Sequence, residues 1–404
     1  GAHVWAPAFL RDHFLPNLQI SGWTMDWYGG LPLYRFYMVI PALAIVALDV
    51  VLPYGIAFKL VAVSGLVLFP LACWAFGRLA NFRHPIPELF AVASLCFLLD
   101  ESFSIYGGNV KSTMAGEYSF SIALTLAVLG LGLLANGLRT GRFRVWAAVV
   151  LSLAAVSHGI VLIFVAVSAT ILCLVWLDRR RAMYALTTGV TVLLLSAWWV
   201  GPFLFGHEFM TDMKYGFRPE GASDSFWEMF FPLAAPLDFI ITALAVIGFV
   251  AMVLRRNLTG TAIGLTSLAF VALVYLTRDS LPGIGLLWNP RLLPFVYLTR
   301  YLLMVIGALE LITWIVNAAK DRRASSELTT YEGAVAAGVI TLSCLVVFGW
   351  MYETLPFDGR VSDGDSSVYA WGPFRKGPES GRAVADGWTR NNMLGYQGPP
   401  KYPQ

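Results

Sequence analysis

Residues 139–181 have the sequence RTGRFRVWAAVVLSLAAVSHGIVLIFVAVSATILCLVWLDRRR. The apolar run 145–177 is basic at both ends, and it is far longer than the ~20 residues that one membrane span requires. Short loops rich in Arg and Lys mark the cytoplasmic side of a membrane protein, so both ends are predicted to face the cytoplasm. A single helix cannot leave and re-enter the same side. The run is therefore predicted to be a hairpin of two short helices that turns at Ser157-His158-Gly159.

The same charge pattern organises the rest of the chain. Basic turns recur between apolar runs, at 78–84, 139–144, 179–181, 255–256 and 320–323. The longer connections carry acids, aromatics and glycines, at 100–118, 204–235 and 278–294. With the basic turns inside, these three loops are predicted to lie outside, and function is expected there. The helices between the two sides make up a bundle of about ten spans over 56–352, and 353–404 is placed outside as the start of a further outer domain.

The composition agrees with a polytopic, all-α bundle of transmembrane helices in the plasma membrane. The chain is 57% hydrophobic and 13% charged, with a mean hydropathy of +0.67, whereas soluble domains are about a quarter charged. The net charge of +3 comes from the inner turns and gives no case for a nucleic-acid partner. All four cysteines lie within apolar runs without metal-ligand spacing, so no metal site is predicted.

The N-terminal segment 1–55 is predicted to be an outer-face loop that carries an interfacial or re-entrant helix. Its apolar run 36–53 holds Pro41, Asp49 and Pro53, which disfavour a continuous spanning helix. A crossing there would also invert every later loop. An outer loop at this place requires a membrane helix before residue 1, so the chain is expected to be part of a longer protein.

An aromatic stretch in this loop supplies the first candidate site. Asp26 lies between Trp23, Trp27 and Tyr28, whose rings would stack on a sugar while the carboxylate deprotonates an acceptor hydroxyl. The alternative is an interfacial turn with a solvated Asp26. Both alternatives fit the composition.

Further candidates follow the spans. Asp100 and Glu101 end one span, either as an acid pair that faces a cleft or as a marker of the membrane edge. The loop that ends at Asn109 is glycine-rich, which suits close approach to a ligand or an ordinary tight turn. His158 at the hairpin tip either forms the floor of a cavity or is a capped buried histidine. Arg291 either holds a lipid phosphate bidentately or extends to the headgroups.

The sequence gives little support for a nucleotide site or for a coupled transporter. Gly130-Leu-Gly132 lies within a predicted helix without a preceding strand, so helix packing explains it better than a nucleotide site. Asp238 and Glu310 are charged residues in predicted spans, and Glu310 is expected either to pair with a neighbour or to have a functional role. No repeat of charged or broken helices, the expected sign of a coupled transporter, is visible.

The order of these parts resembles a GT-C-type membrane glycosyltransferase. The similar stretches are Trp27–Tyr37, Ala57–Leu60, Trp74–Arg78, Ser104–Asn109, Ser157-His158 and Asn289–Pro294. Several of them also resemble actinobacterial membrane proteins labelled as 6-pyruvoyl-tetrahydropterin synthase-related, although the sequence has no soluble zinc-enzyme domain.

The resemblance implies a polyprenyl-phosphate sugar as donor and a cell-envelope glycan or lipid acceptor on the outer face. It assigns the base to Asp26 and the leaving phosphate to Arg291, with His158 and Asp100 or Glu101 lining the site. In this family the catalytic acid often follows the first membrane helix, which would place it before residue 1 and make Asp26 an acceptor-site residue. No cofactor or metal is implied. The alternatives are a transporter or flippase of lipid-linked precursors and a membrane scaffold that binds glycan.

Overall fold

The computed structural model describes residues 2–26, 29–35, 38–103, 105–206, 229–233, 235–277, 289–323 and 327–351. The chain divides into two compact units, one made of residues up to Ala62 with those from Leu342 onward, and the other of Val63–Thr341. Helices dominate both units. In the described ranges, the only strands are β1 (Gly22–Thr24) and β2 (Leu31–Leu33). The all-α fold class is confirmed.

The first unit begins with short elements that the sequence did not predict. They are α1 (Ala2–Phe9), the π-helical turn η1 (Leu10–Phe14), the 3₁₀ turn η2 (Leu15–Asn17) and the antiparallel hairpin β1–β2. They are followed by α2 (Val39–Asp49), which lies within the run 36–53 predicted to hold a helix. An ion pair from Arg11 to Asp49 ties η1 to the end of α2. With 11 residues, α2 is about 17 Å long, well short of the ~30 Å hydrocarbon core. It is too short to cross a membrane, as predicted for 36–53.

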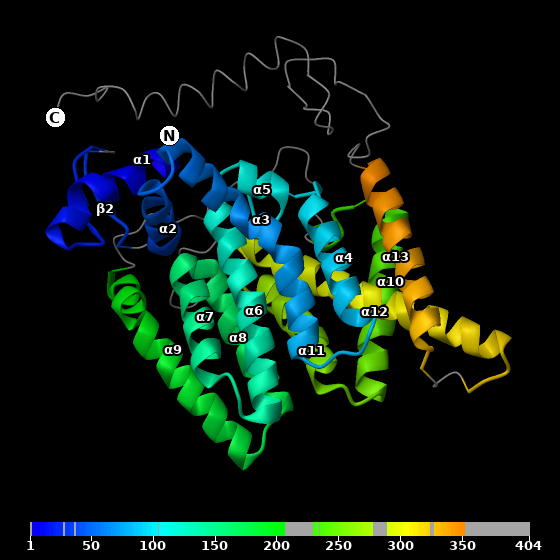
Figure 1. Cartoon of the computed structure of the whole chain (residues 1–404). Coiled ribbons are helices and arrows are strands. Elements are labelled where there is room, and N and C mark those ends of the chain that lie inside the picture. Colours follow the sequence, from blue (N-terminus) through cyan, green and yellow to red (C-terminus); the bar gives the residue numbers. More distant parts are fainter. Residues whose placement is uncertain are drawn as a thin grey trace, which may run out of the picture. The chain divides into compact units, whose positions relative to one another are not determined.

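The second unit is a helical bundle (Figure 1). Its helices are α3 (Tyr54–Leu79, which starts in the first unit), α4 (Ile86–Leu99), α5 (Val110–Met114), α6 (Tyr118–Thr140), α7 (Arg144–Ser157), α8 (Gly159–Val175), α9 (Arg179–Gly206), α10 (Ala235–Leu254), α11 (Leu258–Leu276), η5 (Asn289–Leu292), α12 (Leu293–Ala319) and α13 (Thr330–Met351, which ends in the first unit). Seven of the described helices are long and apolar enough to cross a membrane: α3, α6, α9, α10, α11, α12 with η5, and α13. The chain is thus suited to a multi-pass membrane protein. Because α4, α7 and α8 are shorter, the count of about ten spans stays a prediction.

The hairpin predicted for 145–177 is confirmed. Helix α7 ends at Ser157 and α8 begins at Gly159, with His158 in an extended conformation between them. The His158 Nδ1 accepts a hydrogen bond from the Ile160 amide at 3.3 Å and so caps α8. With 14 and 17 residues, both helices are short, as the charge pattern requires.

Three of the basic turns, at 78–84, 255–256 and 320–323, follow helix C-termini of one type. Helices α3, α10 and α12 are each followed by a residue with positive φ, namely Asn81, Arg256 and Asp321. The next amide then bonds the carbonyl five residues back, as from Phe82 to Gly77 at 2.9 Å. Cationic side chains near these ends also favour the helix dipole. In Figure 1 the turns after α3, α6 and α10 lie at the lower ends of their helices.

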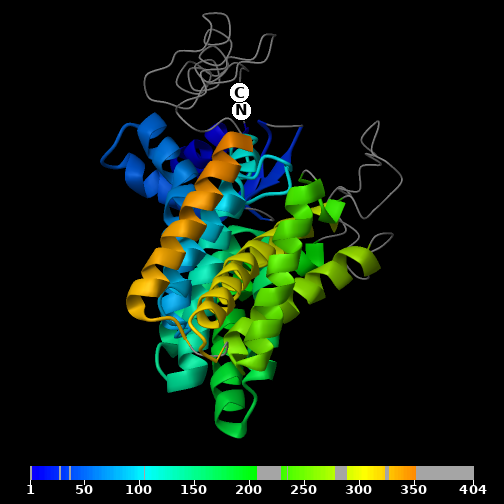
Figure 2. The same ribbon diagram turned by 90° about the vertical axis from the view of Figure 1, so that its right-hand side faces the viewer.

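Helix α12 is the buried centre of this bundle. Every residue from Leu293 to Gly307 is buried, and α4, α10 and α11 all pack against α12. Figures 1 and 2 show α12, in yellow, crossing the bundle beside α10, in green. The first half of α12 is therefore the element on which loops at that end of the bundle are anchored.

Candidate functional site

The connection from α4 to α6 folds around Asn109. Its Oδ1 accepts the Ser112 amide at 2.8 Å and so caps α5. Its Nδ2 donates to the carbonyl oxygens of Asp100 at 2.5 Å and Phe103 at 2.8 Å. The Asn109 side chain is thus fully occupied in holding the loop, which accounts for it without a ligand.

The glycines of this loop lie against the chain itself. Gly107 and Gly108 have φ of 109° and 92°, a region that favours glycine. A Cβ on Gly107 would come within 2.5 Å of the Phe120 ring, and one on Gly108 within 2.7 Å of Phe97. The alternative of an ordinary tight turn is the one that this packing supports. Burial also raises the pKa of Tyr106, which stays protonated at neutral pH.

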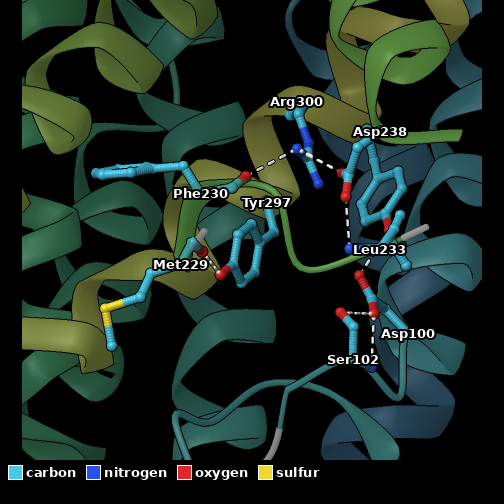
Figure 3. Close-up of polar contacts among 9 residues, drawn as sticks. Asp100, Ser102, Met229, Phe230, Leu233, Asp238, Tyr297 and Arg300 are labelled. Atoms are coloured by element: carbon cyan, nitrogen blue, oxygen red, sulfur yellow. Dashed lines mark hydrogen bonds and ion pairs between the residues drawn. The ribbon is translucent and has the colours of Figure 1, made fainter. Parts of the chain in front are cut away.

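Asp100 connects the same loop to α12. Its Oδ1 accepts the Ser102 amide at 3.0 Å and the Ser102 hydroxyl at 2.5 Å. Its Oδ2 accepts the Tyr301 hydroxyl at 2.6 Å (Figure 3). The residue is fully buried. Asp100 therefore lies inside the bundle rather than on a cleft wall.

Arg291, Glu117 and His158 come together from three separate parts of the chain. Arg291 Nη2 donates to a Glu117 carboxylate oxygen and, at 3.3 Å, to the Ile105 carbonyl. The other Glu117 oxygen lies 3.4 Å from His158 Nε2. Arg291 is only 4% exposed, while the Glu117 side chain keeps 16% exposure. We call these three residues the charged cluster.

The charged cluster does not have the arrangement expected for a headgroup-facing arginine. An Arg291 that extends to lipid headgroups would be exposed, but the guanidinium is buried against a carboxylate. Its Nε has no hydrogen-bond partner among the described residues. His158 matches the alternative of a capped, buried histidine, since its Nδ1 caps α8. In the neutral ring the Nε2 then carries the hydrogen and faces Glu117.

Aromatic rings fill the bundle next to the charged cluster. Phe120 meets the His158 ring edge-on at 5.1 Å and stacks on Phe295 at 5.6 Å. Phe295 in turn contacts Phe164 at 4.6 Å and Phe270 at 5.0 Å. These four phenylalanines come from α6, α12, α8 and α11. They give the charged cluster an apolar floor, which strengthens its electrostatic interactions.

A second polar network ties the segment 229–233 to α12. Arg300 Nη1 lies 3.0 Å from the Asp238 carboxylate and donates to the Phe230 carbonyl at 3.0 Å. Asp238 accepts the Leu233 amide at 2.5 Å, and the Tyr297 hydroxyl donates to the Met229 carbonyl. Figure 3 shows this network beside the hydrogen bonds of Asp100 and Ser102, with Asp100 below Asp238.

The predicted site residues fall into both units. Trp23 and Asp26 belong to the first unit; the Trp23 ring is exposed, and the Asp26 amide donates to Thr24 Oγ1 at 3.2 Å. Trp27 and Tyr28 lie outside the described residues, as do residues 207–228 of the loop 204–235. The other five predicted residues, Asp100, Glu101, Asn109, His158 and Arg291, belong to the second unit. Among them Glu101 is exposed, and its carbonyl accepts Lys111 Nζ at 3.0 Å.

Sequence reasoning missed Glu117, Arg300 and Tyr301. Arg300 had a signal, since an arginine inside an apolar span is costly and rarely incidental. Glu117 had a weaker one, a carboxylate directly before the span that starts at Tyr118. Glu310, which the sequence left open, pairs with Arg255 at 2.7 Å.

Neither comparison with known proteins nor a metal-ligand group among the described residues assigns the chemistry of this site. No family model, no curated protein and no solved structure matches the chain. In the part of the chain that the structure describes, no three His, Cys, Asp or Glu side chains gather as metal ligands would. The chemistry must therefore be argued from the charged cluster itself.

Proposed function

We propose that this protein is a membrane-embedded glycosyltransferase that moves a sugar from a polyprenyl-phosphate donor to a cell-envelope glycan or lipid on the outer face. The charged cluster carries the proposal. It lies where α6 and α12 begin, which is the end of the bundle opposite to their basic turns at Arg139 and Lys320. A buried guanidinium there suits a phosphate that gains charge as it leaves.

The reaction needs a base and a stabilised leaving group. A carboxylate takes the proton of the acceptor hydroxyl, the acceptor oxygen bonds the anomeric carbon, and the bond from that carbon to the phosphate oxygen breaks. Polyprenyl phosphate leaves with the bonding electrons. We assign the leaving phosphate to Arg291 of the second unit. The resemblance gives the base to Asp26, and we propose that Trp23, Trp27 and Tyr28 stack on the sugar; these residues belong to the first unit.

Arg291 has the donors that this role requires. Its Nε–H is free of partners in the described ranges, and its Nη2–H is shared between Glu117 and the Ile105 carbonyl. We propose that a phosphate oxygen accepts the Nε–H, which the Glu117 pair leaves unused. The partial exposure of Glu117 indicates the side from which the ligand enters.

Transfer by the purified full-length protein in lipid nanodiscs tests the proposal. Radiolabelled polyprenyl-phosphate sugars and envelope acceptors are supplied to the wild type, Arg291→Ala and Asp26→Asn. We expect transfer by the wild type and a loss of at least about a hundredfold in each variant, the usual cost of removing a charge-stabilising donor or a base. Glu310→Gln, which removes an ion pair at the other end of α12, is the control and keeps its rate.

The outcomes separate the function from the residue roles. Absence of transfer from every donor would contradict the enzyme. Transfer at the wild-type rate by both variants would instead overturn the roles of Arg291 and Asp26.

A flippase of lipid-linked precursors is the second candidate. The Arg300–Asp238 pair favours it, because buried charges between spanning helices are common in transporters. The four phenylalanines beside the charged cluster argue against it, because they pack closely on one another at the inner side of that cluster. Movement of a fluorescent lipid-linked sugar across proteoliposomes without chemical transfer would favour this candidate.

A further inference from the structure

The loop 100–117 holds Glu117 at one end and Asp100 at the other. Glu117 belongs to the charged cluster, whereas Asp100 lies apart from it. The position of Glu117 relative to Arg291 depends on how this loop is attached to the bundle. The attachments can be followed from Asp100 to Glu117.

At its start the loop is bonded to α12. The Asp100 Oδ2 accepts the Tyr301 hydroxyl at 2.6 Å, across 201 positions of sequence. Phe103 adds a ring contact to Tyr297, one turn earlier on the same helix, at 4.9 Å. Figure 3 shows Asp100 and Ser102 close together on this loop.

Further along, the loop is bonded to the residue that leads into α12. The Ile105 carbonyl accepts Arg291 Nη2 at 3.3 Å, and Glu117 pairs with the same guanidinium. Arg291 and Tyr301 are ten positions apart, about 15 Å along a helix. The loop is thus fastened to the same segment of chain at two separated points.

Between these points Asn109 keeps the loop rigid. Its two amide hydrogens go to the Asp100 and Phe103 carbonyls, and its Oδ1 starts α5. The Thr113 and Ser121 hydroxyls, 2.6 Å apart, then fix α5 to α6. A displacement at Asp100 is therefore transmitted to Ile105 and Glu117.

We propose that Asp100 and Tyr301 are positioning residues for the charged cluster: their hydrogen bond fixes the loop 100–117 on α12 so that Glu117 and Ile105 hold the Arg291 guanidinium. The role of this positioning in sugar transfer rests on the proposed function. The anchoring itself depends only on the contacts. Asp100 is then not a ligand for substrate, because both of its carboxylate oxygens are engaged with the chain.

Two tyrosines of α12 provide a matched pair of variants. Tyr301→Phe removes the hydroxyl that holds Asp100. Tyr297→Phe, one helical turn away, removes a hydroxyl that holds the Met229 carbonyl and so concerns a different segment. Each variant loses a buried hydroxyl oxygen, and with it the hydrogen bond to Asp100 or to the Met229 carbonyl. Both variants keep the aromatic ring, so any difference between them comes from the segment that the lost hydroxyl held.

Hydrogen exchange measures the anchoring without any substrate. In the full-length protein, Tyr301→Phe should speed amide exchange in residues 101–117 by about tenfold or more, the loss expected for a hydrogen bond to a carboxylate. Tyr297→Phe should leave 101–117 unchanged and affect residues near Met229. Unchanged protection of 101–117 in Tyr301→Phe would overturn the proposal.

Transfer kinetics measure the positioning. Tyr301→Phe should lower kcat about tenfold with little change in donor KM, while Tyr297→Phe stays within about twofold of the wild type. Asp100→Asn keeps an acceptor for Ser102 and offers its amide to the Tyr301 oxygen, so it should retain most of the rate, whereas Asp100→Ala should not. Equal loss in Asp100→Asn and Asp100→Ala would contradict positioning and indicate a role for the charge. Faster exchange in Tyr301→Phe, with no transfer even by the wild type, would contradict the proposed function and leave the anchoring supported.

Discussion

Arg291 shows at the residue scale how burial changes the meaning of a charge. From sequence it was open whether this arginine held a phosphate or extended to the headgroups. The structure pairs it with Glu117 and leaves it 4% exposed. A buried charge that loses its partner is costly, whereas a matched apolar or neutral pair often is not. Variants that remove one charge and variants that replace both residues should therefore differ in stability, so the stability of the pair can be measured separately from its function.

The Glu117–Arg291 pair can be tested through its double variant. Arg291→Ala should destabilise the protein by ~3 kcal/mol, at the lower end for buried pairs because Glu117 is partly exposed. Arg291→Met with Glu117→Gln should recover much of that loss, since no charge is left unpaired. Thermal unfolding in nanodiscs gives both values. Equal melting temperatures for Arg291→Ala and the wild type would show that the pair does not form.

At the scale of elements, α10 and α12 approach each other through two glycines. A Cβ on Gly307 would overlap the Leu244 carbonyl oxygen, and one on Gly248 would overlap that of Leu303. Small residues allow this approach between helices. It also brings Asp238 of α10 within 3.0 Å of Arg300 of α12. The ion pair therefore depends on the glycines of both helices.

Substitution of either glycine should separate the helices. Gly307→Ala should cost at least the ~1–3 kcal/mol typical of overpacking, because backbone atoms cannot give way as a side chain would. Gly189→Ala in α9 is the control: nothing lies within 4 Å of its Cβ, so stability should stay or rise by up to ~1 kcal/mol. Denaturation midpoints compare the two. A Gly307→Ala protein as stable as Gly189→Ala would contradict the close approach.

At the scale of the whole molecule, the orientation in the membrane is still a prediction from charge. The basic turns lie at one end of the helices of the second unit, which is consistent with one cytoplasmic side. The orientation in the membrane can be measured by chemical labelling of exposed positions. Asn109 and Arg291 are too buried to report it, but Met114 and Arg142 are exposed.

Cysteine labelling at these two positions decides the orientation. In a background without native cysteines, Met114→Cys should react with an impermeant thiol reagent added to intact cells. Arg142→Cys should react only after the membrane is opened. The reverse pattern would place the charged cluster on the cytoplasmic side and remove the case for an outer-face reaction.

What could be predicted from the sequence was local in character. The run 145–177 with its basic ends was sufficient for the α7–α8 hairpin and its turn at His158. Pro41, Asp49 and Pro53 were sufficient to predict that 36–53 is not a continuous spanning helix, although Pro41 itself lies inside α2. Hydropathy, proline and charge act on neighbouring residues, so their consequences can be derived along the chain.

The partners of the candidate residues could not be derived in this way. The sequence by itself determined an all-α chain of apolar helices. It placed Asp100 and Arg291 at helix ends, His158 at the tip of a hairpin and Asn109 in a glycine-rich loop. Only the tertiary structure decided that Asp100 bonds Tyr301 across 201 positions and that Arg291 meets Glu117 across 174. Such pairs depend on how α12 packs among its neighbours. Packing is set by the summed contacts of many side chains, which no local pattern encodes.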